Sequence, residues 1–93
     1  MKDSYKTNVI FRKARYEDGS AEIIAIFPDS YEEYKKMGRY EIDCYTHIGQ
    51  HSTAALDFYY SNTEKATPSE YKELFEELEN IGYNIRIRQR MHY

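Results

Sequence analysis

The residues with the clearest potential for chemistry are two histidines, His47 and His51, separated by three positions. The flanking positions add a carboxylate, a thiol and a hydroxyl group, those of Asp43, Cys44 and Ser52. A metal site requires three or four such ligands that converge on one point. Because side chains alternate along an extended strand, Asp43 and His47 would share one face while Cys44 points to the other. We therefore expect no bound metal and no cofactor.

The same histidines could act as acid and base in catalysis. A hydroxyl or thiol nucleophile needs an adjacent base, a group that orients the base, and an oxyanion hole. Ser52 next to His51 lacks the sequence contexts in which such sites occur. The two histidines with Tyr45 or Arg86 could instead cleave a phosphodiester by acid–base catalysis. A small histidine-dependent phosphodiesterase or nuclease is therefore the alternative function, and the main hypothesis has no catalytic residue.

Three arginines occupy alternate positions near the end of the chain, Arg86, Arg88 and Arg90. In a strand they would leave the sheet on the side opposite Ile85 and Ile87. Arginine and tyrosine are enriched at protein interfaces, which favours a binding surface here. The predicted binding residues are Arg86, Arg88, Arg90, Tyr45, His47 and His51. The other interpretation is that the arginines pair with Glu41 and Asp43 on a neighbouring strand.

The segment 68–81 has the pattern of a complete capped helix. Thr67, followed three residues later by Glu70, matches a capping box, and Pro68 suits the first helical position. Apolar residues recur at helical spacing on one face, namely Tyr71, Leu74, Phe75, Leu78 and Ile81. Gly82 then supplies the left-handed position at which helices commonly end.

The remainder of the chain is typical of strands. The predicted strands are Thr7–Arg15, Ala21–Phe27, Arg39–Ile48, Ala55–Tyr60 and Tyr83–Met91. Turns are expected at 16–20 and 49–53 and a polar loop at 61–66, while 29–38 fits either a short helix or an ordered loop. The expected core positions are Ile10 or Phe11, Ile24, Ile26, Ile42, Cys44, Leu56, Phe58, Ile85 and Ile87. These elements predict an α+β fold, an antiparallel sheet of about five strands with one long helix packed on one face.

Length and composition limit the classes of function. The 93 residues predict a single domain over 1–93, and the net charge of −3 does not favour nucleic acid as a partner. A single cysteine and the lack of a long apolar segment predict a cytoplasmic protein with no membrane contact. The eleven tyrosines suit either an interface or a half-buried sheet surface.

Four segments carry a family resemblance: Val9–Lys13 (VIFRK), Ile23–Pro28 (IIAIFP), His47–His51 (HIGQH) and the helical stretch that begins at Ala66 (ATPSEY). With them the chain resembles a group of short uncharacterised proteins from gut bacteria of the Bacteroides kind and their phages. The resemblance implies an origin in a mobile element and implies no catalytic residue. This chain departs from the group at 29–38, where an acidic, tyrosine-bearing segment replaces one rich in proline and glycine.

Taken together, these patterns favour a non-catalytic binding module. We expect a protein partner, held through an exposed sheet face or edge that bears tyrosine and arginine. A homodimer formed through an uncovered strand edge is a further alternative, because such edges invite pairing.

Overall fold

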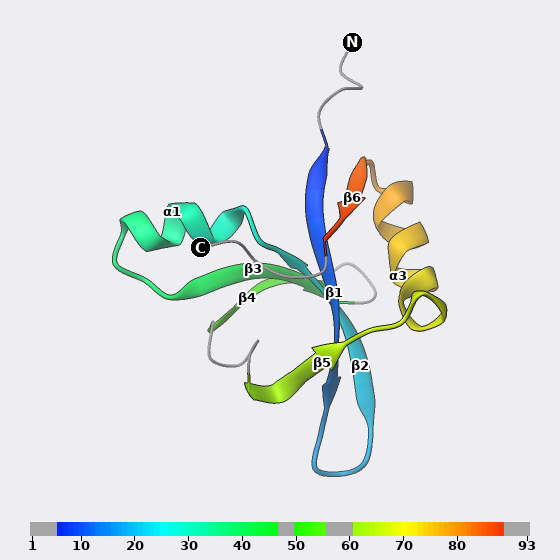
Figure 1. Cartoon of the computed structure of the whole chain (residues 1–93). Helices are drawn as coiled ribbons and strands as arrows, with labels where there is room; N and C mark the ends of the chain where they lie inside the picture. Colours follow the sequence, from blue (N-terminus) through cyan, green and yellow to red (C-terminus); the bar gives the residue numbers. More distant parts are fainter. Residues whose placement is uncertain (1–5, 47–49, 56–60, 89–93) are drawn as a thin grey trace.

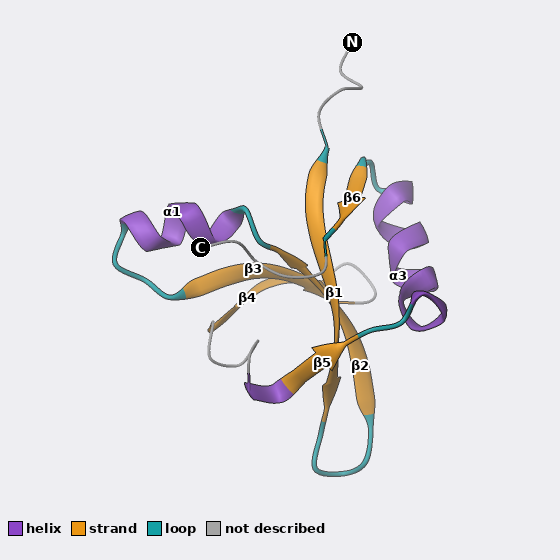
Figure 2. Ribbon diagram, viewed as in Figure 1, coloured by secondary structure: helices purple, strands orange, loops and turns teal. Residues whose placement is uncertain are grey.

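The computed structural model describes residues 6–46, 50–55 and 61–88, and within 50–55 it describes the side chain of Thr53 only. The elements are β1 (Thr7–Arg15), β2 (Ala21–Phe27), α1 (Ser30–Lys36), β3 (Glu41–Thr46), β4 (Gln50–Ala55), β5 (Thr63–Lys65), α3 (Pro68–Asn80) and β6 (Ile85–Ile87). The strands form one sheet in the order β4-β3-β2-β1-β5, with antiparallel pairing throughout this path, and β6 pairs with β1 (Figures 1 and 2). The predicted α+β class is confirmed.

The first two strands form the predicted hairpin. Ile10 lies opposite Ile26 and Arg15 opposite Ala21, so the two strands are paired over six residues each. The connecting turn is held by Asp18, whose carboxylate accepts hydrogen bonds from the backbone N–H and the hydroxyl of Ser20. The Asp-Gly signal therefore identified the turn correctly.

The second hairpin differs from the prediction. Residues 49–53 were expected to be a turn, but β4 begins at Gln50, which lies opposite Thr46 of β3. The strand after β3 therefore begins earlier than expected. Of the predicted fourth strand at 55–60, Ala55 is the last residue of β4, and 56–60 lie outside the described residues.

Two short strands pair with the edge of β1 that faces away from β2. Thr63 and Lys65 of β5 pair antiparallel with the C-terminal half of β1, where a polar loop was predicted. Ile85 and Ile87 of β6 pair parallel with its N-terminal half. Figure 1 shows the reason for the parallel direction: α3 carries the chain back to the end of the sheet where β1 starts, so β6 runs the same way as β1. The described part of this last strand is shorter than predicted.

The long helix α3 begins and ends where the sequence predicts. The backbone N–H of Thr67 donates to a carboxylate oxygen of Glu70 over 2.9 Å, as in a capping box. At the other end Gly82 has a φ of 116°, and the N–H of Tyr83 donates to the carbonyl of Leu78 over 3.1 Å. This is the bond pattern of a helix that ends on glycine.

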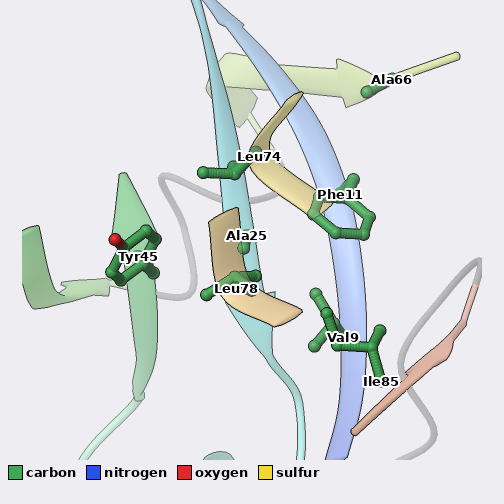
Figure 3. Packing of buried hydrophobic residues seen from close by; sticks show 8 residues of the cluster. All are labelled: Val9, Phe11, Ala25, Tyr45, Ala66, Leu74, Leu78 and Ile85. Carbon is green, nitrogen blue, oxygen red and sulfur yellow. The ribbon is translucent and has the colours of Figure 1, made fainter. Parts of the chain in front are cut away.

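The two faces of the sheet each carry a hydrophobic cluster. On the face covered by α3, the buried residues are Val9, Phe11, Ala25, Tyr45, Ala66, Leu74, Leu78 and Ile85 (Figure 3). On the other face they are Ile10, Ala14, Ile24, Ile26, Tyr31, Ile42 and Cys44, and Tyr31 comes from α1. The short helix, one of two alternatives for 29–38, thus supplies a second layer.

Because of this second layer, the observed core differs from the predicted one. Ile24, Ile26, Ile42 and Cys44 were expected to face the same helix as Ile85, but they lie on the opposite face of the sheet. The reason is register: Ile26 of β2 lies opposite Ile10 and Cys44, so the apolar residues of three strands form their own stripe. The predicted core residues Leu56 and Phe58 lie outside the described residues.

Candidate binding surface

The arginine strand is only partly formed. Arg86 lies in β6 and is exposed, opposite Asn8 of β1. Arg88 follows the strand, where its backbone N–H donates to the carbonyl of Val9 over 2.8 Å and its side chain is half-buried. Arg90 lies outside the described residues. Of the three predicted arginines, the described residues therefore show one, Arg86, as an exposed guanidinium in β6.

The acidic residues proposed to pair with these arginines lie on a strand that is not adjacent to β6. β6 lies next to β1, whereas Glu41 and Asp43 lie on β3, which is flanked by β2 and β4. Glu41 accepts three hydrogen bonds from Arg39, and Asp43 accepts one from the hydroxyl of Tyr34 over 2.7 Å. The interpretation of cross-strand charge pairing with Arg86 is wrong, because β3 is not the neighbour of β6.

The predicted aromatic member of the surface is a core residue. Tyr45 is 1% exposed beneath α3, and its hydroxyl donates a hydrogen bond to the carboxylate of Glu77. It therefore has no ring face to offer a partner. His51 lies in β4 opposite Tyr45, and His47 lies outside the described residues. The structure thus does not bring Tyr45 to the same surface as Arg86.

A different tyrosine and arginine occupy an exposed turn between α1 and β3. Met37 is 60% exposed and Tyr40 is 69% exposed, although both are large and apolar. The turn is formed by backbone bonds: the N–H groups of Met37 and Arg39 both donate to the carbonyl of Tyr34, at 3.0 and 2.9 Å. Gly38 between them has a φ of 75°, which a side chain at this position would disfavour. The conformation that exposes Met37 and Tyr40 is therefore built into the backbone.

Two side chains stiffen this turn. The Arg39 guanidinium binds both carboxylate oxygens of Glu41, at 2.9 and 3.0 Å, and lies 5.5 Å from the centre of the Tyr34 ring. The Tyr34 hydroxyl in turn donates to Asp43, and this hydrogen bond raises the pKa of Tyr34 above its usual value. We call Tyr34, Met37, Arg39 and Tyr40 the Met37–Tyr40 patch. Its members come from a helix end and a turn, so strand alternation could not have indicated it.

Two further cations, Lys13 and Arg15, form structural ion pairs with carboxylates. Lys13 binds Glu70 across the junction of β1 and α3, and Arg15 binds Glu64 on β5 at 2.8 Å. A polar depression next to them is lined by Ser61, Asn62 and Thr63 as well as by these cations. Each cation already faces a carboxylate, so the depression offers an anionic ligand little net attraction.

Within the described ranges, no three His, Cys, Asp or Glu side chains gather closely enough to hold a metal ion. None of the helices described is long and apolar enough to cross a membrane. Comparison with known proteins adds no relative, since no family model, curated protein or solved structure matches the chain.

Proposed function

We propose that this chain is a non-catalytic binding module that holds a protein partner through the Met37–Tyr40 patch. The observation that carries the proposal is the exposure of two large apolar side chains, Met37 and Tyr40, on one ordered turn. Tyrosine, methionine and arginine are enriched at protein interfaces, and tyrosine and arginine dominate their binding energy. All three types occur in this patch.

The rigidity of the turn supports the same proposal. Association costs free energy for every side chain that must be immobilised. Arg39 is already held by its three hydrogen bonds to Glu41 and by its position over Tyr34. A partner that packs on Tyr40 and Met37 would therefore find the Arg39 guanidinium beside them already ordered.

The proposal keeps the protein-binding function expected from the sequence and moves its site. Tyr40 takes the place of the buried Tyr45, and Arg39 provides a guanidinium beside it. The patch lies at the opposite side of the molecule from α3 (Figure 2), so the partner would approach the end of the sheet where β3 begins. A protein is favoured over nucleic acid because Arg39 and Lys36 are each paired with a glutamate, at 2.7 and 4.0 Å.

The proposal is tested by quantitative capture from the producing cells with three matched baits. The wild-type chain, a Met37→Ser/Tyr40→Ser variant and an Ile81→Ser control are immobilised, and the recovered proteins are quantified by mass spectrometry. Ile81 is a fair control because it is 54% exposed and lies at the end of α3, away from the patch. A thermal melt of each bait shows that folding is intact.

The expected result is a partner that the wild type and Ile81→Ser recover equally and the patch variant loses. Losing hot-spot side chains costs about 2 kcal/mol or more, so recovery at limiting bait should fall at least about tenfold. Equal recovery by all three baits would contradict the proposed site. Hydrolysis of a model phosphodiester by the wild type, abolished in a His47→Ala/His51→Ala variant, would favour the enzymatic alternative instead.

A further inference from the structure

The outer edge of β2 is only partly paired. β2 pairs with β1 from Ala21 to Ile26, but β3 covers its other side only at Ala25–Phe27. In the described part of the chain, the segment Ala21–Ile24 therefore has a strand on one side only. Figure 2 shows this end of the β1–β2 hairpin extending beyond the rest of the sheet. Such an edge presents backbone N–H and carbonyl groups that can pair with an added strand.

A small groove runs between this edge and α3. Ile23 and Leu74 form its apolar part, Glu70 and Glu73 of α3 supply carboxylates beside them, and Glu22 completes the lining. Its volume is about 150 Å³. Pockets for small-molecule ligands usually measure roughly 300–1,000 Å³, so this groove suits a single long side chain better than a separate ligand.

The charges around the groove favour a cation. Glu70 binds Lys13, and its pKa is lowered to about 2, so it stays ionised at neutral pH. Glu22 lies opposite Ala14 of β1, whose side chain belongs to the other face of the sheet, so the Glu22 carboxylate, which accepts a hydrogen bond from the Tyr16 hydroxyl, lies on the face away from α3. Glu73 is exposed and makes no ion pair with any described residue. The two carboxylates of α3 thus face one lysine, which leaves net negative charge beside an apolar floor.

Lysine and arginine side chains match this combination. Their methylene stems cover apolar surface while their charged heads stay at its polar rim. Ile23 and Leu74 would contact the stem, and Glu73 lies at the rim for the ammonium or guanidinium group. The neighbouring open edge adds main-chain hydrogen bonds, the usual source of affinity when an extended peptide joins a sheet.

We propose that the edge Ala21–Ile24 and the adjoining groove bind an extended peptide segment that carries a lysine or arginine. The segment adds as a strand beside β2, and its basic side chain enters the groove between Ile23 and Glu73. This site is separate from the Met37–Tyr40 patch, and the proposal does not depend on that patch.

Binding is measured with a fluorescein-labelled, end-capped peptide of sequence Thr-Val-Lys-Val-Thr, and with the same peptide carrying glutamate in place of lysine. Fluorescence anisotropy gives the affinities, and ¹⁵N-resolved amide spectra of the protein locate the contact. The protein variants are Glu73→Lys, which reverses the charge at the groove, and Glu79→Lys, which makes the same charge change elsewhere on α3. Both glutamates are exposed helix residues, so neither change should disturb folding.

The lysine peptide should bind at least tenfold more tightly than the glutamate peptide, and Glu73→Lys should weaken it at least tenfold more than Glu79→Lys. Amide shifts should concentrate in Ala21–Ile24 and in the first turns of α3. Equal effects of the two variants would overturn the proposal, because general charge attraction would then explain the binding. Shifts confined to other strands, or no saturable binding of the lysine peptide up to millimolar concentration, would also overturn it.

Discussion

The Lys13 ammonium and the Glu70 carboxylate lie 2.5 Å apart and join the central strand β1 to the first turn of α3. The same carboxylate accepts the hydrogen bond from the Thr67 N–H that caps the helix. One side chain therefore fixes both the start of the helix and its position on the sheet. The hydrogen bond from Lys13, followed by that from the Thr67 backbone, lowers the pKa of Glu70 to about 2 from an ordinary value of 4.5.

This depressed pKa predicts a loss of stability in acid. A carboxyl group with a lower pKa in the folded state stabilises the fold above its unfolded value, and that contribution is lost as pH falls through the folded value. For Glu70 the window runs from 4.5 down to about 2. Over this window the free energy of unfolding should fall more steeply in the wild type than in Glu70→Gln, measured by urea unfolding at a series of pH values.

Other acidic groups titrate in the same range, so the comparison needs a control. Bonds from Arg15 lower the pKa of Glu64, and bonds from Ser20 lower that of Asp18. Both remain in Glu70→Gln, so the difference between the two proteins isolates Glu70. Glu79→Gln, at an exposed position of the same helix, should keep the wild-type slope. If the free energy of unfolding falls with pH equally in the wild type and in Glu70→Gln, the Lys13–Glu70 pair contributes no pH-dependent stability.

The packing of α3 predicts a second result. Leu78 is fully buried between the helix and the sheet (Figure 3), whereas Ile81, less than one turn later, is 54% exposed. Leu78→Ala should therefore cost about 2–5 kcal/mol, as large-to-small changes in a core do. Ile81→Ala should stay within about 0.5 kcal/mol of the wild type, as surface changes usually do. Urea unfolding measures both, and a loss below about 0.5 kcal/mol for Leu78→Ala would show that this helix face is not core.

Much of α3 could be predicted because its signals are local. A capping box needs only Thr67 and Glu70, and the helix end needs only Gly82, so neighbouring residues determine both. β4 and β5 carry no such signals. Gln50–Ala55 lacks an alternating apolar pattern, and its pairing with β3 makes it a strand. Thr63–Lys65 is too short and polar to indicate a strand, and Arg12, which donates to the Thr63 hydroxyl and carbonyl, helps to hold it on β1.

The site was harder to predict, for a physical reason. Alternation along β3 correctly places Tyr45 and Cys44 on opposite faces, but it cannot tell which face is covered. With a helix on each side, both residues are buried, so Tyr45 is no surface residue. Met37 and Tyr40 lie in a turn, where no periodicity applies. Their exposure follows from the backbone bonds to Tyr34, which become visible only in three dimensions.

The glycine at the end of α3 gives a third prediction. Gly82 has a φ of 116°, and a side-chain carbon added there would meet no atom within 4 Å. The cost of Gly82→Ala is therefore conformational rather than steric, and should be about 1–2 kcal/mol. Asn80→Ala, at an exposed position in the last helical turn, is the control and should change the unfolding midpoint little. Equal stability of wild type and Gly82→Ala would show that the chain does not need a left-handed residue here.

Two tyrosines, one buried and one exposed, should separate stability from binding. Tyr45 is 1% exposed and donates a hydrogen bond to the charged Glu77, so Tyr45→Phe should cost about 1–3 kcal/mol in unfolding. Its folded form should still capture the partner, because the Tyr45 ring does not reach the surface.

Tyr40 is 69% exposed, and Tyr40→Ser should leave the unfolding midpoint nearly unchanged while capture falls. Unfolding and capture assays on the same preparations give both readouts. Loss of capture by Tyr45→Phe with unchanged stability would restore the β3 surface as the binding site and remove the Met37–Tyr40 patch.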